Sequence, residues 1–113
     1  MDKFIPRGCH DNKGKVNLNY DGIDLVAMLS GDIDHHSTQE IKTYIDDEII
    51  KRNPSCLVID FKNVRFMDSS GIGLVLGRYK KLGYKNSRIR IINIPERLYR
   101  IFKISGLKVL GIL

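Results

Sequence analysis

The sequence predicts a single α/β domain, with a mixed β-sheet of four to five strands that has a parallel core and helices packed against it. Two observations lead to this fold class. A β-hairpin signal stands near the start of the chain, and after it strand-like apolar runs alternate with segments whose apolar residues recur at helical spacing. Because crossovers between parallel strands are right-handed and short, we expect these segments to share one sheet with the hairpin.

The composition is that of one globular domain. The chain has 113 residues, of which 42% are hydrophobic and 28% charged, and this is too short for a multidomain enzyme. No apolar run approaches the ~20 residues of a membrane span, and the first residues lack a signal-peptide pattern. Cys9 and Cys56 have no metal-type or redox-type spacing, so we expect reduced thiols. These features predict a cytoplasmic protein with no membrane partner.

The net charge of +6 is divided unevenly along the chain. Residues 1–60 carry a balance of −4, whereas residues 61–113 carry +10. Such asymmetry suggests an oriented acidic partner, with nucleic acid or an anionic membrane as other candidates, or else a basic face exposed only to solvent. The basic residues are spread singly among Ile, Leu and Val, and the aromatic residues do not cluster for base stacking, so we expect no direct binding of nucleic acid.

The first elements are a leader and a hairpin. Residues 1–15 lack periodicity and predict a poorly ordered leader, which leaves the domain at residues 16–113. Residues 16–20 alternate between apolar and polar side chains, and Asp21-Gly22 is a strong turn signal. An apolar-rich segment at residues 23–29 completes the expected hairpin.

A polar loop at residues 31–36 is expected to lead into the first helix. Ser37-Thr38-Gln39-Glu40 fits the S-x-x-E capping box at a helix start. One apolar stripe follows at i, i+4 and i+8, and Asn53-Pro54 ends it. The stripe consists of Ile41, Ile45 and Ile49.

The second half predicts two more helices. The continuous apolar run of residues 56–61 is typical of a central parallel strand buried on both faces. The other expected elements are a turn at residues 62–63, a second helix whose stripe runs from Ile72 to Leu82 and ends at Gly83, a strand at residues 88–92, a third helix between Pro95 and Gly106, and a short final strand at residues 107–113.

The segment Asp68-Ser69-Ser70-Gly71 places two hydroxyls in the first turn of the second helix. One interpretation is an ordinary N-cap, because Asp and Ser accept the free N–H groups at a helix start. The other is a phosphorylation site, since the positive end of a helix tolerates a phosphate. A phosphate there would change what the surface binds without melting the helix.

Three more specific functional sites have weaker support in the sequence. Ser69 or Ser70 with His35 or His36 and an Asp supplies the residue types of a catalytic triad, but the G-x-S-x-G elbow is absent. Asp32, Asp34, His35 and His36 are potential metal ligands, although neighbours on a short loop rarely converge on one ion. A dinucleotide site at Gly71, Gly73 and Gly77 is disfavoured because ten residues separate Asp60 from Gly71, where the fingerprint needs a tight turn.

Two motifs in the same order resemble a known family. The segments Gly31-Asp32-Ile33-Asp34-His35-His36 and Phe66-Met67-Asp68-Ser69-Ser70-Gly71-Ile72-Gly73 are similar to those of the sporulation-type anti-sigma factor antagonists, the small single-domain members of the STAS family. The resemblance runs from about Asn17 to Leu110. Family members continue into a C-terminal helix, and without one part of the sheet is expected to be uncovered.

The resemblance implies a partner switch controlled by phosphorylation. The unphosphorylated antagonist binds an anti-sigma factor that is itself a serine kinase, and a sigma factor is released. The kinase phosphorylates the serine after the motif's Asp, here Ser69 with Ser70 as the alternative, and a phosphoprotein phosphatase restores the binding form. The antagonist is then no enzyme and needs no cofactor, because ATP and magnesium belong to the kinase. The alternative is a STAS module of another pathway, such as a stress-response regulator or a nucleotide-binding domain.

The same resemblance suggests which residues form the kinase footprint. We expect the loop at residues 32–36 to lie near Ser69, because loops at one end of a parallel sheet cluster there. Gly71 would let the kinase approach the backbone closely. The expected partner-binding residues are Asp32, Asp34, His35, Asp68, Ser70, Gly71, Ile72 and Arg78.

Overall fold

The computed structural model describes residues 12–113 as a four-stranded sheet with the order β1-β2-β3-β4. β1 pairs with β2 antiparallel, and the other two pairs are parallel, so the predicted mixed sheet with a parallel core is confirmed. The elements in chain order are β1 (Lys15–Tyr20), β2 (Asp24–Ile33), α1 (His35–Arg52), β3 (Cys56–Met67), α2 (Ser69–Lys81), the 3₁₀ turn η2 (Asn86–Arg88), β4 (Ile89–Ile92), the 3₁₀ turn η3 (Glu96–Leu98) and α3 (Tyr99–Ile104).

The hairpin between β1 and β2 forms where the Asp21-Gly22 signal predicts it. The Asp21 carboxylate accepts hydrogen bonds from the backbone N–H groups of Ile23 and Asp24, at 2.9 and 2.7 Å. These bonds lower the pKa of Asp21, with the Asp24 bond contributing most. Gly22 has φ +97°, a conformation that L side chains rarely adopt. The turn thus depends on both of its signal residues.

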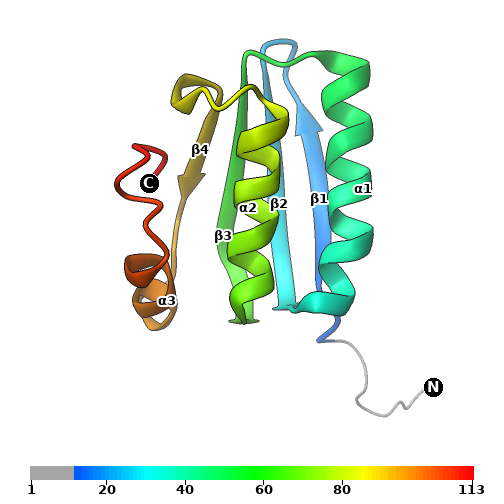
Figure 1. Ribbon diagram of the computed structural model, residues 1–113. Coiled ribbons are helices and arrows are strands. Elements are labelled where there is room, and N and C mark those ends of the chain that lie inside the picture. Colours follow the sequence, from blue (N-terminus) through cyan, green and yellow to red (C-terminus); the bar gives the residue numbers. More distant parts are fainter. Residues whose placement is uncertain (1–11) are drawn as a thin grey trace, which may run out of the picture.

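The helices α1 and α2 cover the same face of the sheet (Figure 1). The strand residues on that face are fully buried, and they include Leu57, Ile59 and Phe61 of β3. On the other face Val58 and its cross-strand neighbour Val26 are only half-buried. The expectation that residues 56–61 are buried on both faces is therefore wrong for the second face. Val58 is apolar although it is only half-buried, because the neighbouring strands still cover part of its surface.

β2 and β3 extend further than their sequence patterns indicate. The expected loop over Gly31–Ile33 belongs to β2, and the expected turn at Lys62-Asn63 lies inside β3. The two extensions pair with each other, with Ile33 opposite Met67. Register shifts between Met28 and Ser30 and between Gly31 and Asp32 interrupt the period-two pattern, which is why the sequence does not reveal these strand ends.

α1 begins earlier than the capping-box motif suggests. Asp34 is the N-cap, and its side chain accepts a hydrogen bond from the backbone N–H of Ser37 at 2.8 Å. The Ser37 hydroxyl accepts in return from the N–H of Asp34 at 3.0 Å. Ser37 thus occupies the N3 position of a capping box whose N-cap is Asp34, and the predicted box with Ser37 as N-cap is wrong. Asn53 ends the helix as predicted.

The two ends of the described chain also differ from the expected pattern. Gly14 is buried and Lys15 already belongs to β1, so part of the expected leader is ordered, while residues 1–11 lie outside the described residues. The expected final strand at residues 107–113 is a series of turns. Only the hydrogen bond from the N–H of Ile91 to the carbonyl of Ile112, at 3.0 Å, joins this segment to β4.

Within residues 12–113 we find no helix that is long and apolar enough to cross a membrane.

Candidate partner-binding site

The carboxyl ends of β2 and β3 place two helix N-termini side by side. Asp32 pairs with Phe66 and Ile33 with Met67, and the N–H of Asp68 donates to the carbonyl of Ile33 at 3.2 Å. A single residue separates the end of β2 from the start of α1, and a single residue separates the end of β3 from the start of α2. Figure 1 shows the starts of both helices at the same end of the sheet. The two motifs that are far apart in the sequence therefore form one surface.

Asp68 is the N-cap of α2 and leaves Ser69 at the first helical position. The Asp68 carboxylate accepts a hydrogen bond from the N–H of Ser70 at 2.8 Å, and its carbonyl accepts from the N–H of Gly71 at 3.1 Å. Ser69 is exposed, whereas Ser70 is half-buried. A phosphoryl group on the Ser69 hydroxyl would thus lie in solvent at the positive end of α2. Of the two candidate serines, Ser69 is the more accessible.

Asp34 is held in place by the cap of α1. Its hydrogen bond from the Ser37 N–H is the largest cause of a pKa below the ordinary value for aspartate. His35, the first residue of α1, is exposed beside it. The side of the surface that belongs to α1 therefore presents one carboxylate that stays ionised and one exposed imidazole.

Asp32 is engaged by a residue that the sequence does not single out. Arg65 of β3 donates from Nε and Nη2 to the two oxygens of the Asp32 carboxylate, at 3.0 and 2.9 Å. This bidentate pair raises the pKa of Arg65, chiefly through the hydrogen bond that Arg65 donates to Asp32. The sequence alone does not reveal that Arg65 pairs with Asp32, because the register shifts between β2 and β3 decide which residues of the two strands lie close together.

Three of the expected footprint residues lie in the interior. Gly71 and Ile72 are buried, and a Cβ on Gly71 would collide with Cγ and Sδ of Met67. Arg78 is 8% exposed, and its Nε lies 2.9 Å from Oδ1 of Asp46 on α1. The missing side chain of Gly71 makes room for Met67 rather than exposing the backbone to solvent. These residues support the expected kinase footprint from the interior of the domain.

A hollow of about 320 Å³ lies between the first half of α1 and α2. Its ionisable lining residues are His35, Lys42 and Arg78, all of them basic. Gly73 and Gly77 leave it open, because a Cβ at either position would meet nothing within 4 Å. Along residues 12–113 no three His, Cys, Asp or Glu side chains are grouped to hold a metal ion.

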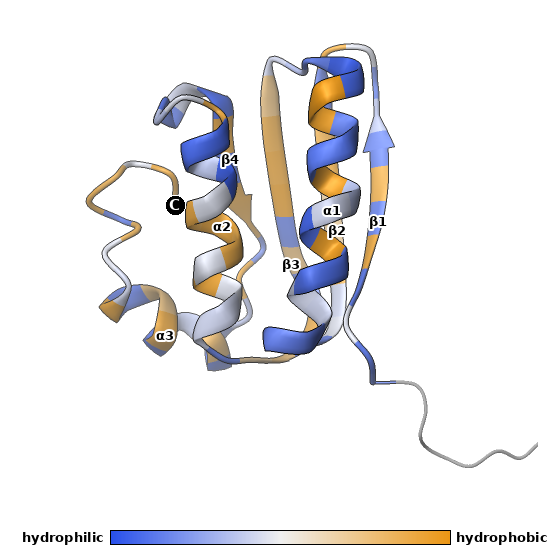
Figure 2. Ribbon diagram, turned by 45° about the vertical axis from the view of Figure 1, so that its right-hand side comes forward, coloured by the Kyte–Doolittle hydropathy of each residue, from blue (hydrophilic) through white to orange (hydrophobic). Residues whose placement is uncertain are grey.

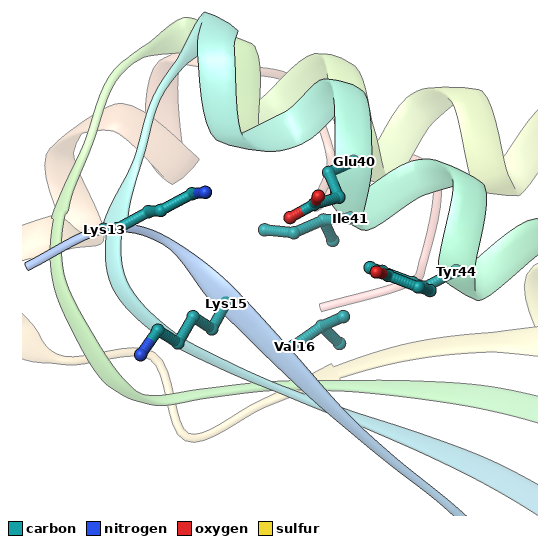
Figure 3. A pocket seen from close by; sticks show the side chains of 6 residues that line it. All are labelled: Lys13, Lys15, Val16, Glu40, Ile41 and Tyr44. Carbon is teal, nitrogen blue, oxygen red and sulfur yellow. The ribbon is translucent and has the colours of Figure 1, made fainter. Parts of the chain in front are cut away.

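A second hollow, of about 380 Å³, lies between β1 and α1 (Figure 3). In the close view Lys13 and Glu40 extend toward it from opposite sides, while Val16 lies below Ile41 and Tyr44. None of the expected footprint residues lines this hollow. We therefore place the candidate site at the starts of α1 and α2.

Comparison with known proteins agrees with this geometry. The STAS domain family matches residues 16–110 of the chain. The anti-sigma F factor antagonist of Paenibacillus polymyxa is 36% identical over 83 residues, which are 74% of this chain and 71% of that protein. The anti-sigma-B factor antagonist of Listeria monocytogenes is 32% identical over 87 residues, which are 77% of this chain and 74% of that protein.

Solved structures show the same arrangement of strands and helices. The unphosphorylated form of the anti-sigma factor antagonist SpoIIAA matches with a TM-score of 0.73 and 32% identity, over 82% of each chain. The phosphorylated form of SpoIIAA from Bacillus matches with a TM-score of 0.67 and 31% identity, over 85% of this chain and 87% of that one. Family match, sequence identity and fold coincide over the described domain, and the chain belongs to the STAS domain family.

Proposed function

We propose that this protein is an anti-sigma factor antagonist of the sporulation type, with Ser69 as its phosphorylation switch. The observation that carries the proposal is the exposed Ser69 hydroxyl at the first position of α2, directly after the Asp68 cap. The relatives named anti-sigma factor antagonist support it, as does the similarity to SpoIIAA, whose phosphorylated and unphosphorylated forms are both solved.

The switch works by charge rather than by unfolding. A phosphoserine adds about two negative charges at pH 7, and the positive end of α2 accommodates them without loss of the helix. Asp68 and Asp34 already place negative charge beside Ser69. The added charge repels acidic groups of a bound partner and removes the uncharged hydroxyl from the contact. The phosphorylated form therefore keeps the fold and loses affinity.

The proposed partner is an anti-sigma factor that is itself a serine kinase. In its unphosphorylated form the antagonist binds this kinase in the cytoplasm, and the sigma factor is released. The kinase supplies ATP and magnesium for transfer to Ser69, and a phosphoprotein phosphatase restores the binding form. The antagonist serves as ligand and substrate, and it has no catalytic residues or cofactor of its own.

The exposed and half-exposed side chains at the two helix starts form the proposed footprint. They are Asp32, Asp34, His35, Asp68 and Ser70, with Ser69 between them. Gly71, Ile72 and Arg78 contribute by packing beneath this surface, since each of them is buried. Arg78 reaches a partner only through the hollow between α1 and α2.

The experiment is a comparison of Ser69→Ala and Ser69→Asp for binding to the host's anti-sigma factor kinase. Ser69→Ala is expected to bind like the unmodified protein and to resist phosphorylation, whereas Ser69→Asp is expected to bind at least about tenfold more weakly. Ser87→Asp is the matched control, because Ser87 is also exposed but lies in η2. Equal affinity of the two Ser69 variants would refute the switch.

Mass spectrometry after incubation with kinase and ATP locates the modified residue. One phosphoryl group on Ser69 is the expected result, and modification of Ser70 would keep the mechanism but move the switch. An unmodified protein, with kinase activity verified on another substrate, would instead favour a STAS module of another pathway.

A further inference from the structure

A second surface beside Ser69 combines exposed apolar side chains with arginines. It surrounds a hollow of about 450 Å³ between the end of β3 and α3, and we call it the β3–α3 patch. Phe66 is 52% exposed and Ile104 is 80% exposed, which is unusual for large apolar residues that lie together. The patch consists of Phe66, Leu98, Ile101 and Ile104 with Arg65, Arg97 and Arg100.

Specific contacts hold this surface in shape. Arg97 donates hydrogen bonds to the backbone carbonyls of Val64 and Arg65, which ties η3 to the end of β3. On the inner side of α3, Phe102 packs edge-to-face on Phe61 with ring centroids 5.0 Å apart. These contacts turn Ile104 outward and leave it without a cover among residues 12–113.

The ionisable side chains that line the patch are all arginines. Arg65 is paired with Asp32, and Arg97 is bonded to carbonyl groups. Arg100 is exposed and makes no ion pair or hydrogen bond with any side chain in the described part of the chain. The surface therefore matches a segment that has apolar side chains flanked by carboxylates.

The patch adjoins the kinase footprint through the Arg65–Asp32 ion pair, but α3 lies on the other side of the start of α2 from α1. Figure 1 shows the start of α2 between the start of α1 and α3, and Figure 2 shows α3 with both hydrophilic and hydrophobic residues on its surface. The α1 side carries Asp34, so a phosphate on Ser69 adds to negative charge there. The α3 side carries Arg100, whose positive charge offsets the repulsion between this phosphate and an acidic partner on that side.

We propose that the β3–α3 patch is the docking surface for an acidic, apolar segment of the phosphatase that dephosphorylates Ser69. This inference rests on the proposed function. A phosphatase has to bind the phosphorylated form, which repels the kinase, and so it needs contacts that the phosphate does not weaken. The patch supplies such contacts within reach of Ser69, because Phe66 is only three residues before it in the chain.

The test uses the full chain with phosphoserine incorporated at position 69 during translation, so that it does not depend on the kinase step. Arg100→Glu and Ile104→Ser are expected to raise the KM of the host's phosphatase about tenfold each, with kcat unchanged. Lys81→Glu and Val109→Ser are the matched controls. Lys81 is an exposed cation at the end of α2, and Val109 is 88% exposed, so neither change removes a buried contact.

Kinase binding of the unphosphorylated variants separates the two proposals. We expect Arg100→Glu and Ile104→Ser to bind the kinase like the unchanged protein. An unchanged phosphatase KM, the same rise in KM for the control variants, or an equal loss of kinase affinity would overturn the docking surface. Failure of the unchanged protein to bind the kinase would instead count against the proposed function, whatever the phosphatase does.

Discussion

Arg78 of α2 and Asp46 of α1 form a buried ion pair that joins the two helices beneath the proposed binding surface. Nε of Arg78 lies 2.9 Å from Oδ1 of Asp46, and the two side chains are 9% and 21% exposed. The N–H groups are not aligned for a hydrogen bond, and Nη1 has no partner among the described residues. Burial lowers the pKa of Arg78, and the charge of Asp46 acts in the opposite direction. The guanidinium therefore depends on Asp46 for compensation.

Removal of one member of this pair should lower the free energy of unfolding more than removal of both members does. Asp46→Ala leaves the buried guanidinium of Arg78 without a counter-charge and is expected to lower the free energy of unfolding by about 3 kcal/mol. Asp46→Ala with Arg78→Met replaces the charges by apolar surface and should recover at least half of that loss. Urea denaturation measures both, with Asp47→Ala as an exposed neighbour expected to change stability by less than about 0.5 kcal/mol. A double variant less stable than Asp46→Ala would contradict this, because it would show that the Arg78 side chain is stabilising even without Asp46.

The cap of α1 predicts an acid-sensitive contribution to stability. The hydrogen bond from the Ser37 N–H lowers the pKa of Asp34 in the folded protein, so the unfolded chain binds the proton more readily. The resulting stabilisation is present above about pH 4 and is lost as the pH falls through the folded pKa. Asp34→Asn caps the helix without titrating, and thus the stability advantage of the unchanged protein over this variant should shrink below about pH 4. Thermal unfolding from pH 3 to 7 tests this, and a constant difference would contradict it.

Much of the fold follows from short-range patterns in the sequence. The Asp21-Gly22 turn, the stripe of Ile41, Ile45 and Ile49, and the stop at Asn53-Pro54 are local signals, and the structure confirms the elements that they predict. The position of the two helix starts beside each other also follows, because both come after parallel strands.

What the sequence could not reveal depends on contacts between distant residues. The end of β2 is a strand only because Ile33 pairs with Met67 across two register shifts. Likewise, the sequence alone is compatible with a solvent-facing Arg78 on a helix, whereas in the structure α1 places Asp46 against it. Gly71 reads as an opening for a partner, whereas Met67 fills the space above it. In each case the partner is set by packing and not by sequence spacing.

Two glycines of α2 should respond in opposite ways to alanine. A Cβ at Gly73 would meet nothing within 4 Å, and so Gly73→Ala is expected to raise the free energy of unfolding by about 0.5–1 kcal/mol through lower backbone entropy of the unfolded chain. Gly71→Ala forces the buried side chain of Met67 to move and should lower the free energy of unfolding by about 1–3 kcal/mol. Chemical denaturation of both variants decides the sign, and a stabilised Gly71→Ala would mean that Met67 repacks without cost.

The Asp32–Arg65 pair should matter less for stability than its bidentate geometry suggests. The Arg65 side chain is 59% exposed and that of Asp32 26%, so water screens the attraction and salt weakens it further. A double-mutant cycle with Asp32→Asn and Arg65→Gln is expected to give a coupling energy below about 1 kcal/mol that falls in 1 M NaCl. Because Arg65 already neutralises the Asp32 carboxylate, Asp32→Asn should also weaken kinase binding less than Asp34→Asn does. If Asp32→Asn proved the more damaging of the two, the kinase would have to break this ion pair and bind the carboxylate itself.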